Sequence, residues 1–402
     1  MKILQVCHRV PFPPIDGGNI AMMNMALSLI AAGNEVHQFC LNTSRHFIDT
    51  KEIPIHIVEK LHLTTSAIDT RINVKDAFLN LFQNSSYNIQ RFYSTSVEHD
   101  LVKKLKSEEF DFVQLETLFS APYISAIKKN SKAKIILRAH NVEHIIWERL
   151  ALSQKNPIKK RYLTLLSKRL KKFELKTLHD VDAIIPITDI DEAHFRKLNY
   201  NGPMISLPLG VDLKEYIEFH NKDAALNLVH LGSMDWLPNR EGVEWFLKKC
   251  WTTIHSKHPL LKLFLAGRDF PKELEELNPP NVIFQGRVDH ANNYLSDKQI
   301  MIVPLFSGSG MRVKIIQVLV LGKTIISTTI GAEGIDVTHG KNILLADTPE
   351  DFLIYVTRCL ENPIWCREIG LNGYQLAIEK YSLEAVGKSE NLFLKNLQKS
   401  KN

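Results

Sequence analysis

Short apolar runs rich in β-branched residues alternate with longer helical patterns along almost the whole chain. Helical patterns fill the intervals, for example at Ile20–Ala32, Glu241–His255 and Glu350–Leu360. Alternation of this kind predicts an α/β fold with parallel sheets and helices on both faces. The predicted strands are Ile3–Cys7, Val36–Leu41, Phe112–Leu115, Ile135–Arg138, Ala183–Ile187, Leu228–Leu231, Leu263–Ala266, Val282–Gln285, Ile300–Pro304 and Thr324–Ser327.

The alternation is interrupted once, by the proline and glycine of Leu207–Asp212, and then starts again. A chain of 402 residues also exceeds one ordinary hydrophobic core. We therefore predict two doubly wound domains that face each other across a cleft, where the carboxyl ends of the strands bind ligands. The expected divisions are residues 1–206, a hinge at 207–214, a second domain at 215–380, and a helix within 381–402 that returns to the first domain.

The composition, with 45% hydrophobic and 23% charged residues, is that of an ordinary soluble protein. No apolar run reaches the length of a membrane span, and Met1–Cys7 predicts a first strand rather than a signal peptide. The five cysteines form no C-x-x-C pair, which favours reduced thiols and a cytoplasmic protein. A net charge of +6 suits an anionic partner without indicating nucleic-acid binding.

A small-residue turn, Ser307–Met311, connects a predicted strand to a predicted helix. Such a turn leaves backbone N–H groups, here including those of Ser309 and Gly310, unpaired at the positive end of the helix dipole. Arg312 and Lys314, expected in the first helical turn, add full charges, so the segment predicts a phosphate site. The alternative is a plain glycine-rich turn with two solvated cations.

Other small-residue turns follow predicted strands and would open into the same cleft. Glycine there lets backbone amides approach an anion closely. For the first of these turns the alternative is a simple turn with Asn19 as helix N-cap. The dinucleotide fingerprint G-x-G-x-x-G follows no predicted strand, which disfavours a Rossmann dehydrogenase. The turns are Gly17-Gly18, Gly232-Ser233 and Gly267-Arg268.

Over nearly its whole length the chain resembles the family 4 glycosyltransferases of GT-B fold. A weaker similarity, through His8–Pro14, is to bacterial exopolysaccharide sugar transferases. The segments that carry the family resemblance are the Gly17-Gly18 loop, His140 after a strand, Pro208–Asp212, Leu231–Asn239, and Ser307–Glu333 with its Gly331-Ala-Glu-Gly334.

The resemblance implies a nucleotide-sugar site and a metal-independent reaction without a cofactor. His140 would act as a neutral imidazole that hydrogen-bonds a sugar hydroxyl; the alternative is a histidine that caps the following helix. The residues expected to act in catalysis are His140, Arg312 and Lys314. Those expected to bind the donor are Gly17, Gly18, Gly232, Ser233, Gly267, Arg268, Val288, Ser309, Gly310, Gln317 and Glu333.

The chain departs from the family pattern at two glutamates that many members carry eight positions apart. Ser309 and Gln317 occupy those positions here, and neither bears a negative charge. Gln317 can still hydrogen-bond ribose hydroxyls through its amide. Many members also bind the diphosphate with an Arg and a Lys that are missing here, and we infer that Arg312 and Lys314 supply that charge.

The segment Lys155–Lys176 contains a single acid, Glu174, among nine basic residues. An apolar stripe runs along the same predicted helix. One interpretation is a peripheral contact with an anionic membrane at the inner face; the other is a surface helix whose stripe packs on the first domain. The basic residues are Lys155, Lys159, Lys160, Arg161, Lys168, Arg169, Lys171, Lys172 and Lys176.

We predict a retaining glycosyltransferase that moves a sugar from a nucleotide-diphosphate donor to a hydroxyl of a glycan or lipid-linked acceptor in cell-surface polysaccharide synthesis. Two alternatives stay open. A nucleotide-sugar 2-epimerase on the same fold would need a carboxylate acid–base pair, which Ser309 and Gln317 do not provide. A non-catalytic nucleotide-sugar-binding partner of a synthase is the other.

Overall fold

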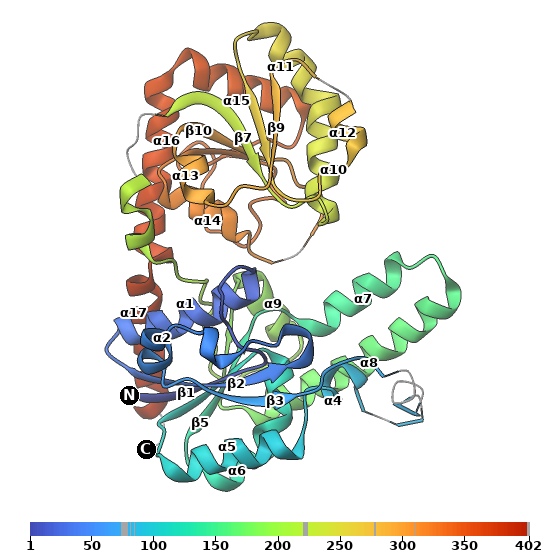
Figure 1. The fold of residues 1–402 in the computed structure, drawn as a ribbon, viewed down its shortest axis with the longest axis vertical. Helices are drawn as coiled ribbons and strands as arrows, with labels where there is room; N and C mark the ends of the chain where they lie inside the picture. Colours follow the sequence, from blue (N-terminus) through green and yellow to red (C-terminus); the bar gives the residue numbers. More distant parts are fainter. Residues whose placement is uncertain are drawn as a thin grey trace. The chain divides into compact units, whose positions relative to one another are not determined.

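The computed structural model describes residues 1–73, 79–80, 82–83, 85–219, 224–276, 279–308 and 310–399. The chain forms two compact units (Figure 1). The first consists of Met1–Gly210 together with Val386–Asn402, and the second of Val211–Ala385.

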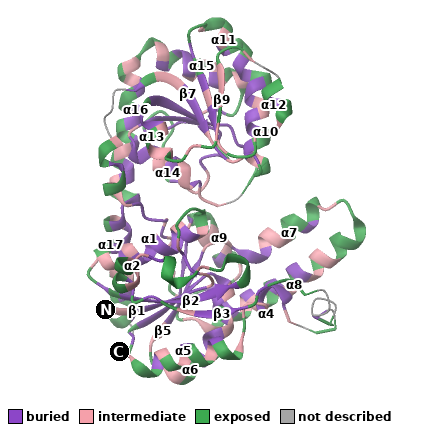
Figure 2. Ribbon diagram, viewed as in Figure 1, coloured by how far each residue is buried: buried purple, intermediate pink, exposed green. Residues whose placement is uncertain are grey.

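A parallel six-stranded sheet, ordered β3-β2-β1-β4-β5-β6, forms the centre of the first unit. Most strand residues are buried because helices cover both faces, as the continuous apolar runs predict (Figure 2). Along β1, Ile3 and Cys7 enter one core, and Leu4 and Val6 enter the other. The strands are β1 (Lys2–Cys7), β2 (Glu35–Thr43), β3 (Thr64–Ile68), β4 (Phe112–Glu116), β5 (Lys134–Ala139) and β6 (Ala183–Pro186).

Helices of the first unit divide between the two faces of this sheet. Residues of α5, α6 and α8 share one core, whereas α1 and α17 share the other. The helices α7 and α8 pack against each other along their length (Figure 1). The bounds are α1 (Gly17–Ala31), α2 (Ile55–Lys60), α4 (Tyr87–Gln90), α5 (Thr95–Ser107), α6 (Ile124–Asn130), α7 (Glu143–Ser153), α8 (Pro157–Asp180), α9 (Asp189–Lys197) and α17 (Leu383–Lys399), with the 3-10 turn η3 (Leu118–Tyr123).

The second unit repeats this topology in a parallel sheet ordered β12-β11-β10-β7-β8-β9. Its strands are β7 (Ala225–Leu231), β8 (Leu263–Ala266), β9 (Val282–Gly286), β10 (Lys298–Val303), β11 (Thr324–Ser327) and β12 (Leu344–Leu345). Its helices are η4 (Leu213–Phe219), α10 (Leu237–Trp245), η5 (Phe246–Trp251), α11 (Thr252–Lys257), α12 (Lys272–Glu276), α13 (Ala291–Ser296), α14 (Val313–Val320), α15 (Pro349–Glu361), α16 (Pro363–Leu376) and η6 (Ala377–Tyr381).

All ten predicted strands are present, with ends that shift by at most three residues. The prediction missed β3, whose sequence Thr-Thr-Ser-Ala-Ile has no apolar run, and β12, which is only two residues long. The helix predicted at Glu241–His255 is the central part of a continuous α–π–α segment. Cys7 and Cys40 are free, buried thiols, as predicted.

The C-terminal helix α17 packs on the first unit, which confirms that expectation. Leu394 and Leu397 join the core that contains Ile3. The approach is close at Gly387, where an added Cβ would lie 1.9 Å from the carbonyl oxygen of Ser28. Only glycine fits at this crossing, because backbone cannot move aside as a flexible side chain can.

Replacement of Gly387 by valine should therefore destabilise the first unit by about 2–3 kcal/mol, as overpacking of a close contact does. Chemical denaturation followed by circular dichroism would measure the loss. The control is Lys388→Ala, at an exposed position of the same helix, which should change stability little. Equal stability of Gly387→Val and the wild type would contradict the packing described.

Candidate active site

The strand order of each sheet reverses beside its first strand. In the second unit β7 and β10 are neighbours, and their following connections run to opposite faces of the sheet. Doubly wound folds bind ligands at this reversal, outside the carboxyl ends of the strands. The turn after β7 and the loop after β10 meet that description, and both contain residues predicted from the sequence.

The loop after β10 turns twice through backbone conformations that favour glycine. Gly308 has φ +110° and Gly310 has φ +80°. Helix α14 begins at Val313, so Arg312 is its N-cap and not a first-turn residue as predicted. The Arg312 side chain makes no capping hydrogen bond, which leaves the first-turn amides available to a ligand. Ser309 lies outside the described residues.

The Arg312 side chain is buried and folds back over its own loop. Its Nη1 donates to the carbonyl oxygen of Gly310, and its guanidinium lies 5.4 Å from the ring centroid of Trp236. Burial lowers the pKa of Arg312, while the attraction of Glu333 opposes that shift. A Cβ at Gly308 would lie 2.9 Å from Arg312 Nη2, and the φ of +110° at this position favours glycine. The structure thus brings Gly310, Arg312 and Glu333 together.

Lys314, in the first turn of α14, is half-buried. Burial lowers the pKa of Lys314 to about 8, and the carboxylate of Asp235 limits the shift. Loss of solvent makes this ammonium readily titratable near neutral pH. An arriving phosphate would restore its preference for the charged form.

His230, on β7 beside Lys314, was not predicted from the sequence. Burial lowers the pKa of His230 to about 4, and the charge of Lys314 adds a smaller effect in the same direction, so the imidazole is neutral. Its Nδ1 is 3.1 Å from the carbonyl oxygen of Ile302 and must carry the proton. Its buried Nε2 has no hydrogen-bond partner among the described residues. That lone pair lies beside Gly232 and can accept from a ligand hydroxyl or N–H.

The turns after β7 and β8 interlock through their backbones. The N–H of Gly232 donates to Ala266 over 2.8 Å, and the N–H of Met234 donates to Arg268 over 2.8 Å. A Cβ at Gly267 would lie only 1.8 Å from the oxygen of Gly232. Four predicted residues, Gly232, Ser233, Gly267 and Arg268, therefore lie side by side at one edge of the sheet. Val288 is half-buried in the connection after β9.

Gln317 is half-buried on α14 and is already engaged within the second unit. Hydrogen bonds from the side chains of Gln317 and Asn292 to the Tyr216 oxygen oppose the effect of burial, which raises the pKa of Tyr216 to about 12. One N–H of the Gln317 amide serves Tyr216, so its second N–H and its amide oxygen are left for a ligand.

In the first unit, α1 begins at Gly17, directly after the extended segment that follows β1. Its N-cap is Asp16, whose carboxylate accepts from the N–H of Asn19 over 3.0 Å, so the alternative with Asn19 as N-cap is wrong. Arg9 pairs with Asp16 at 2.5 Å, and its Nη2 would lie 2.6 Å from a Cβ at Gly18. Sequence reasoning missed this guanidinium, which lies against the Gly17-Gly18 turn.

His140 follows β5 and bonds to a buried carboxylate from the neighbouring strand. Its Nε2 is 2.7 Å from Oε2 of Glu116. The other carboxylate oxygen, Oε1, accepts from the side-chain amides of Gln5 at 2.6 Å and Gln114 at 2.9 Å. The next helix begins at Glu143 and has no side-chain cap, so His140 is not the predicted alternative, a helix cap. With Glu116 accepting from the Nε2–H, Nδ1 of His140 is left as an acceptor.

His8, at the end of β1, lies close enough to His140 for their charges to interact. Burial lowers the pKa of His8 to about 3, and the charge of His140 adds a smaller effect in the same direction. The buried Nδ1 of His8 has no hydrogen-bond partner among the described residues. A neutral, partly unsatisfied imidazole beside His140 adds a polar group to this edge of the sheet.

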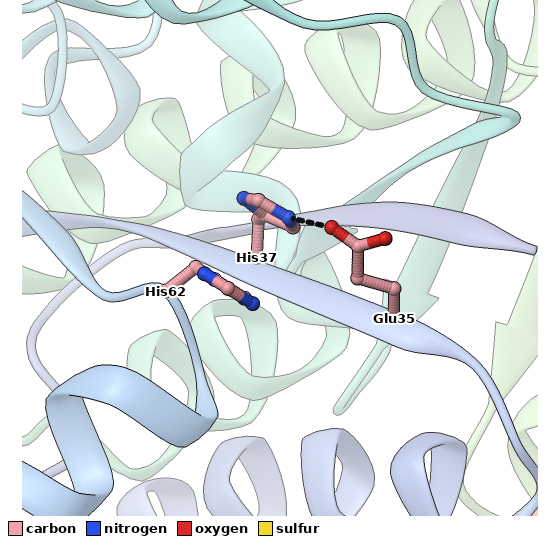
Figure 3. Close-up of side chains that lie close together, drawn as sticks. All are labelled: Glu35, His37 and His62. Carbon is pink, nitrogen blue, oxygen red and sulfur yellow. Dashed lines mark hydrogen bonds and ion pairs between the residues drawn. The ribbon is translucent and has the colours of Figure 1, made fainter.

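Within the described residues, one group of side chains is close enough to hold a metal ion: Glu35, His37 and His62, whose ligand atoms lie within 4.8 Å of one another. His37 bonds to Glu35 at 2.7 Å and stacks on His62 at a centroid distance of 4.2 Å (Figure 3). Lys2 already pairs with Glu35 at 3.2 Å. This group lies at the amino end of β2, away from the carboxyl ends that carry the predicted site.

Two family models match the chain in succession. One described as Glycosyltransferase Family 4 matches residues 15–215, and one described as Glycosyl transferases group 1 matches residues 225–362. The chain belongs to glycosyltransferase family 4. It is therefore a glycosyltransferase of GT-B fold, which confirms the fold and the enzyme class predicted from the sequence.

The relatives of this family 4 member are distant in sequence. An uncharacterized 44.6 kDa protein in the cps region of Klebsiella pneumoniae is 22% identical over 96% of this chain and 97% of its own length. Sucrose-phosphate synthase from Thermosynechococcus elongatus superposes with a TM-score of 0.68 at 18% identity and full coverage of both chains. Anabaena HepE in complex with UDP-glucose superposes at 0.63 and 13% identity, over 98% of this chain and all of that chain.

The depressed pKa of Lys314 predicts that binding of a nucleoside diphosphate beside it depends on pH. The charged form of Lys314 attracts phosphate and is lost as the pH rises through about 8. Affinity for a nucleoside diphosphate should therefore fall about tenfold between about pH 7 and pH 9, the change in the protonated fraction. Isothermal titration calorimetry at both pH values would measure this affinity.

The matched variant for this test is Lys314→Arg, whose guanidinium stays charged over that range. It should bind with little dependence on pH, whereas Lys314→Ala should bind weakly at both ends. A pH dependence that persists unchanged in Lys314→Arg would show that another group titrates.

Proposed function

We propose that this glycosyltransferase moves a sugar, with retention of anomeric configuration, from a nucleotide-diphosphate donor to a hydroxyl of a glycan or lipid-linked acceptor. The observation that carries the proposal is the cationic segment at the strand reversal of the second unit, where buried Arg312 and half-buried Lys314 follow the turn at Gly310. Complexes of HepE with UDP and UDP-glucose support the donor class. The cps-region relative supports a role in surface polysaccharide synthesis.

The diphosphate would bind at the start of α14, where uncapped amides and two cations converge. Arg312 would exchange its bond to the Gly310 carbonyl for bonds to a phosphate oxygen. Such charge-assisted bonds contribute about 1.5–3 kcal/mol each. The base and ribose would lie over Gly232 and Gly267, near Arg268, Val288 and the amide oxygen of Gln317.

In the reaction, the bond between the anomeric carbon and the β-phosphate oxygen breaks, and a bond to the acceptor oxygen forms on the same face. The acceptor proton passes to the departing diphosphate. Negative charge develops on the β-phosphate, and fixed positive groups in a poorly solvated site stabilise it. We assign this task to Arg312, Lys314 and nearby amides, so the proposed reaction needs no metal.

His140 would contribute a hydrogen bond from the first unit. Glu116 holds Nε2, so Nδ1 is the atom left to accept from a sugar or acceptor hydroxyl. The Gly17-Gly18 turn and Arg9 supply donors for an anionic group at the same sheet edge. Glu116 is thus a positioning residue for His140.

The proposal is tested by incubating the protein with a panel of nucleotide sugars and candidate acceptors, and by scoring nucleoside diphosphate release. We expect release from one or a few donors, unchanged turnover with EDTA, and product with the donor's anomeric configuration by NMR. Binding without any release would favour the non-catalytic partner. An isomerised sugar nucleotide would favour the 2-epimerase.

Removal of the Arg312 guanidinium tests the assignment of charge. Arg312→Ala should cut turnover by about ten- to a hundred-fold, because each charge-assisted bond to the transition state contributes about 1.5–3 kcal/mol. Arg240→Ala removes an exposed cation from α10 nearby and should leave turnover unchanged. Wild-type turnover in Arg312→Ala would remove the central assignment.

The basic segment lies mainly on α8, whose apolar stripe, including Leu166 and Leu170, is buried against the first unit. The same hairpin exposes Leu150, Leu152 and Ile158, by 45%, 68% and 80%. No helix in the described ranges is long and apolar enough to cross a bilayer. We propose that α7 and α8 rest on an anionic membrane surface, where a lipid-linked acceptor would be presented.

Neutralisation of exposed charges tests the membrane contact. Each basic residue near an anionic surface adds about 1 kcal/mol. Replacing Lys159, Lys160, Lys168 and Lys171 with Gln should therefore weaken sedimentation with anionic vesicles at least about tenfold and spare donor hydrolysis. Raised salt should mimic the substitutions. Wild-type protein that stays in the supernatant at low salt would leave a soluble acceptor instead.

A further inference from the structure

A cavity of about 730 Å³ lies in the first unit, outside the site described above. It is formed by α4, the segment that follows it, η3 and α8. The side chains of Ile89, Tyr93, Pro122 and Phe173 make its wall largely apolar. Its volume is in the range of pockets that enclose a small ligand.

One side of the cavity is basic. Arg169, Lys172 and Lys176 recur at helical spacing along α8, with Phe173 between them, so they share one face of the helix. No acidic residue is among the described residues that line the cavity. The one acid of the basic segment, Glu174, is buried and bonds to His144 at 2.5 Å.

The arginine of this basic side is held by a hydrogen bond, whereas its two lysines are exposed. Arg169 is fixed, because its Nη1 donates to the backbone oxygen of Asn80 over 2.7 Å. Lys172 and Lys176 are exposed and form no ion pair within the described part of the chain. Like charges four residues apart on a helix repel each other. An anion bound between Lys172 and Lys176 would remove that repulsion.

The surroundings of the cavity favour a membrane ligand over a soluble one. Tyr93, in the cavity wall, is exposed by 43%, and Leu79, which lines a neighbouring hollow together with Gln90 and Tyr93, is exposed by 58%. Exposed apolar side chains that gather around an apolar cavity mark an interaction surface. A free sugar or nucleotide would need many polar partners, whereas this wall offers hydrocarbon contact and cations.

We propose that this cavity binds a membrane lipid phosphate, with hydrocarbon against Tyr93 and Phe173 and the phosphate between Lys172 and Lys176. The site deepens the proposed function, since it rests on the membrane contact of α8, and it names the lipid chemistry that this contact recognises. It would hold the transferase beside the bilayer through one specific lipid as well as through general charge.

Titration of the full-length protein with decyl phosphate below its micelle concentration tests the proposal by calorimetry. The comparison ligands are inorganic phosphate, which has the anion without the alkyl chain, and decyl maltoside, which has the alkyl chain without the anion. Decyl phosphate should bind at least about tenfold more tightly than either. Equal binding of decyl maltoside would show an apolar cavity only, and equal binding of inorganic phosphate would show an anion site only; both overturn the proposal.

Two matched variants locate the binding. Lys172→Gln with Lys176→Gln removes two charges from the cavity rim, and Lys168→Gln with Lys171→Gln removes two exposed charges of α8 that do not line it. Decyl phosphate affinity should fall at least about tenfold in the first pair only. Equal losses in both pairs would overturn the site in favour of general electrostatics. Because no sugar donor is present, failure of transfer and failure of lipid binding remain distinguishable.

Discussion

The parallel pairing of β7 with β10 is the constraint on which the candidate donor site depends. The connections that follow β7 and β10 run to opposite faces of the sheet, so no crossover helix covers the carboxyl ends of these two strands. The turn at Gly232 and the loop that contains Gly308 and Gly310 occupy that edge, and Gly267 lets the turn after β8 contact the turn after β7. In the first unit the same reversal, between β1 and β4, positions His8 and Glu116 at one edge.

Burial with an unused ring nitrogen recurs at both edges, at His230 in the second unit and at His8 in the first. In the second unit burial lowers the pKa values of Arg312, Lys314 and His230, because a poorly solvated site disfavours their charged forms. A bound diphosphate would supply the missing negative charge. In the first unit, Glu116 is satisfied by three side chains and so fixes His140, whereas His8 keeps an unused nitrogen.

Much of the fold could be predicted because short apolar runs mark buried parallel strands, as at Leu263–Ala266 and Thr324–Ser327, where prediction and structure coincide. Loop residues of the site were predicted where glycine signals close approach. His230 and Glu116 were missed because their strands suggested only core packing. The bonds of Arg312 to Gly310 and of Gln317 to Tyr216 depend on loop geometry that local sequence does not encode.

The central claim is that the loop before α14 binds the diphosphate of the donor and that the turn after β7 binds its nucleoside. Hydrogen–deuterium exchange with and without a nucleoside diphosphate tests it most directly, because bound amides exchange slowly. The account predicts protection of residues 310–316 and 232–234 on ligand addition. Protection confined to other segments, with these amides exchanging at the rate of the free protein, would contradict it.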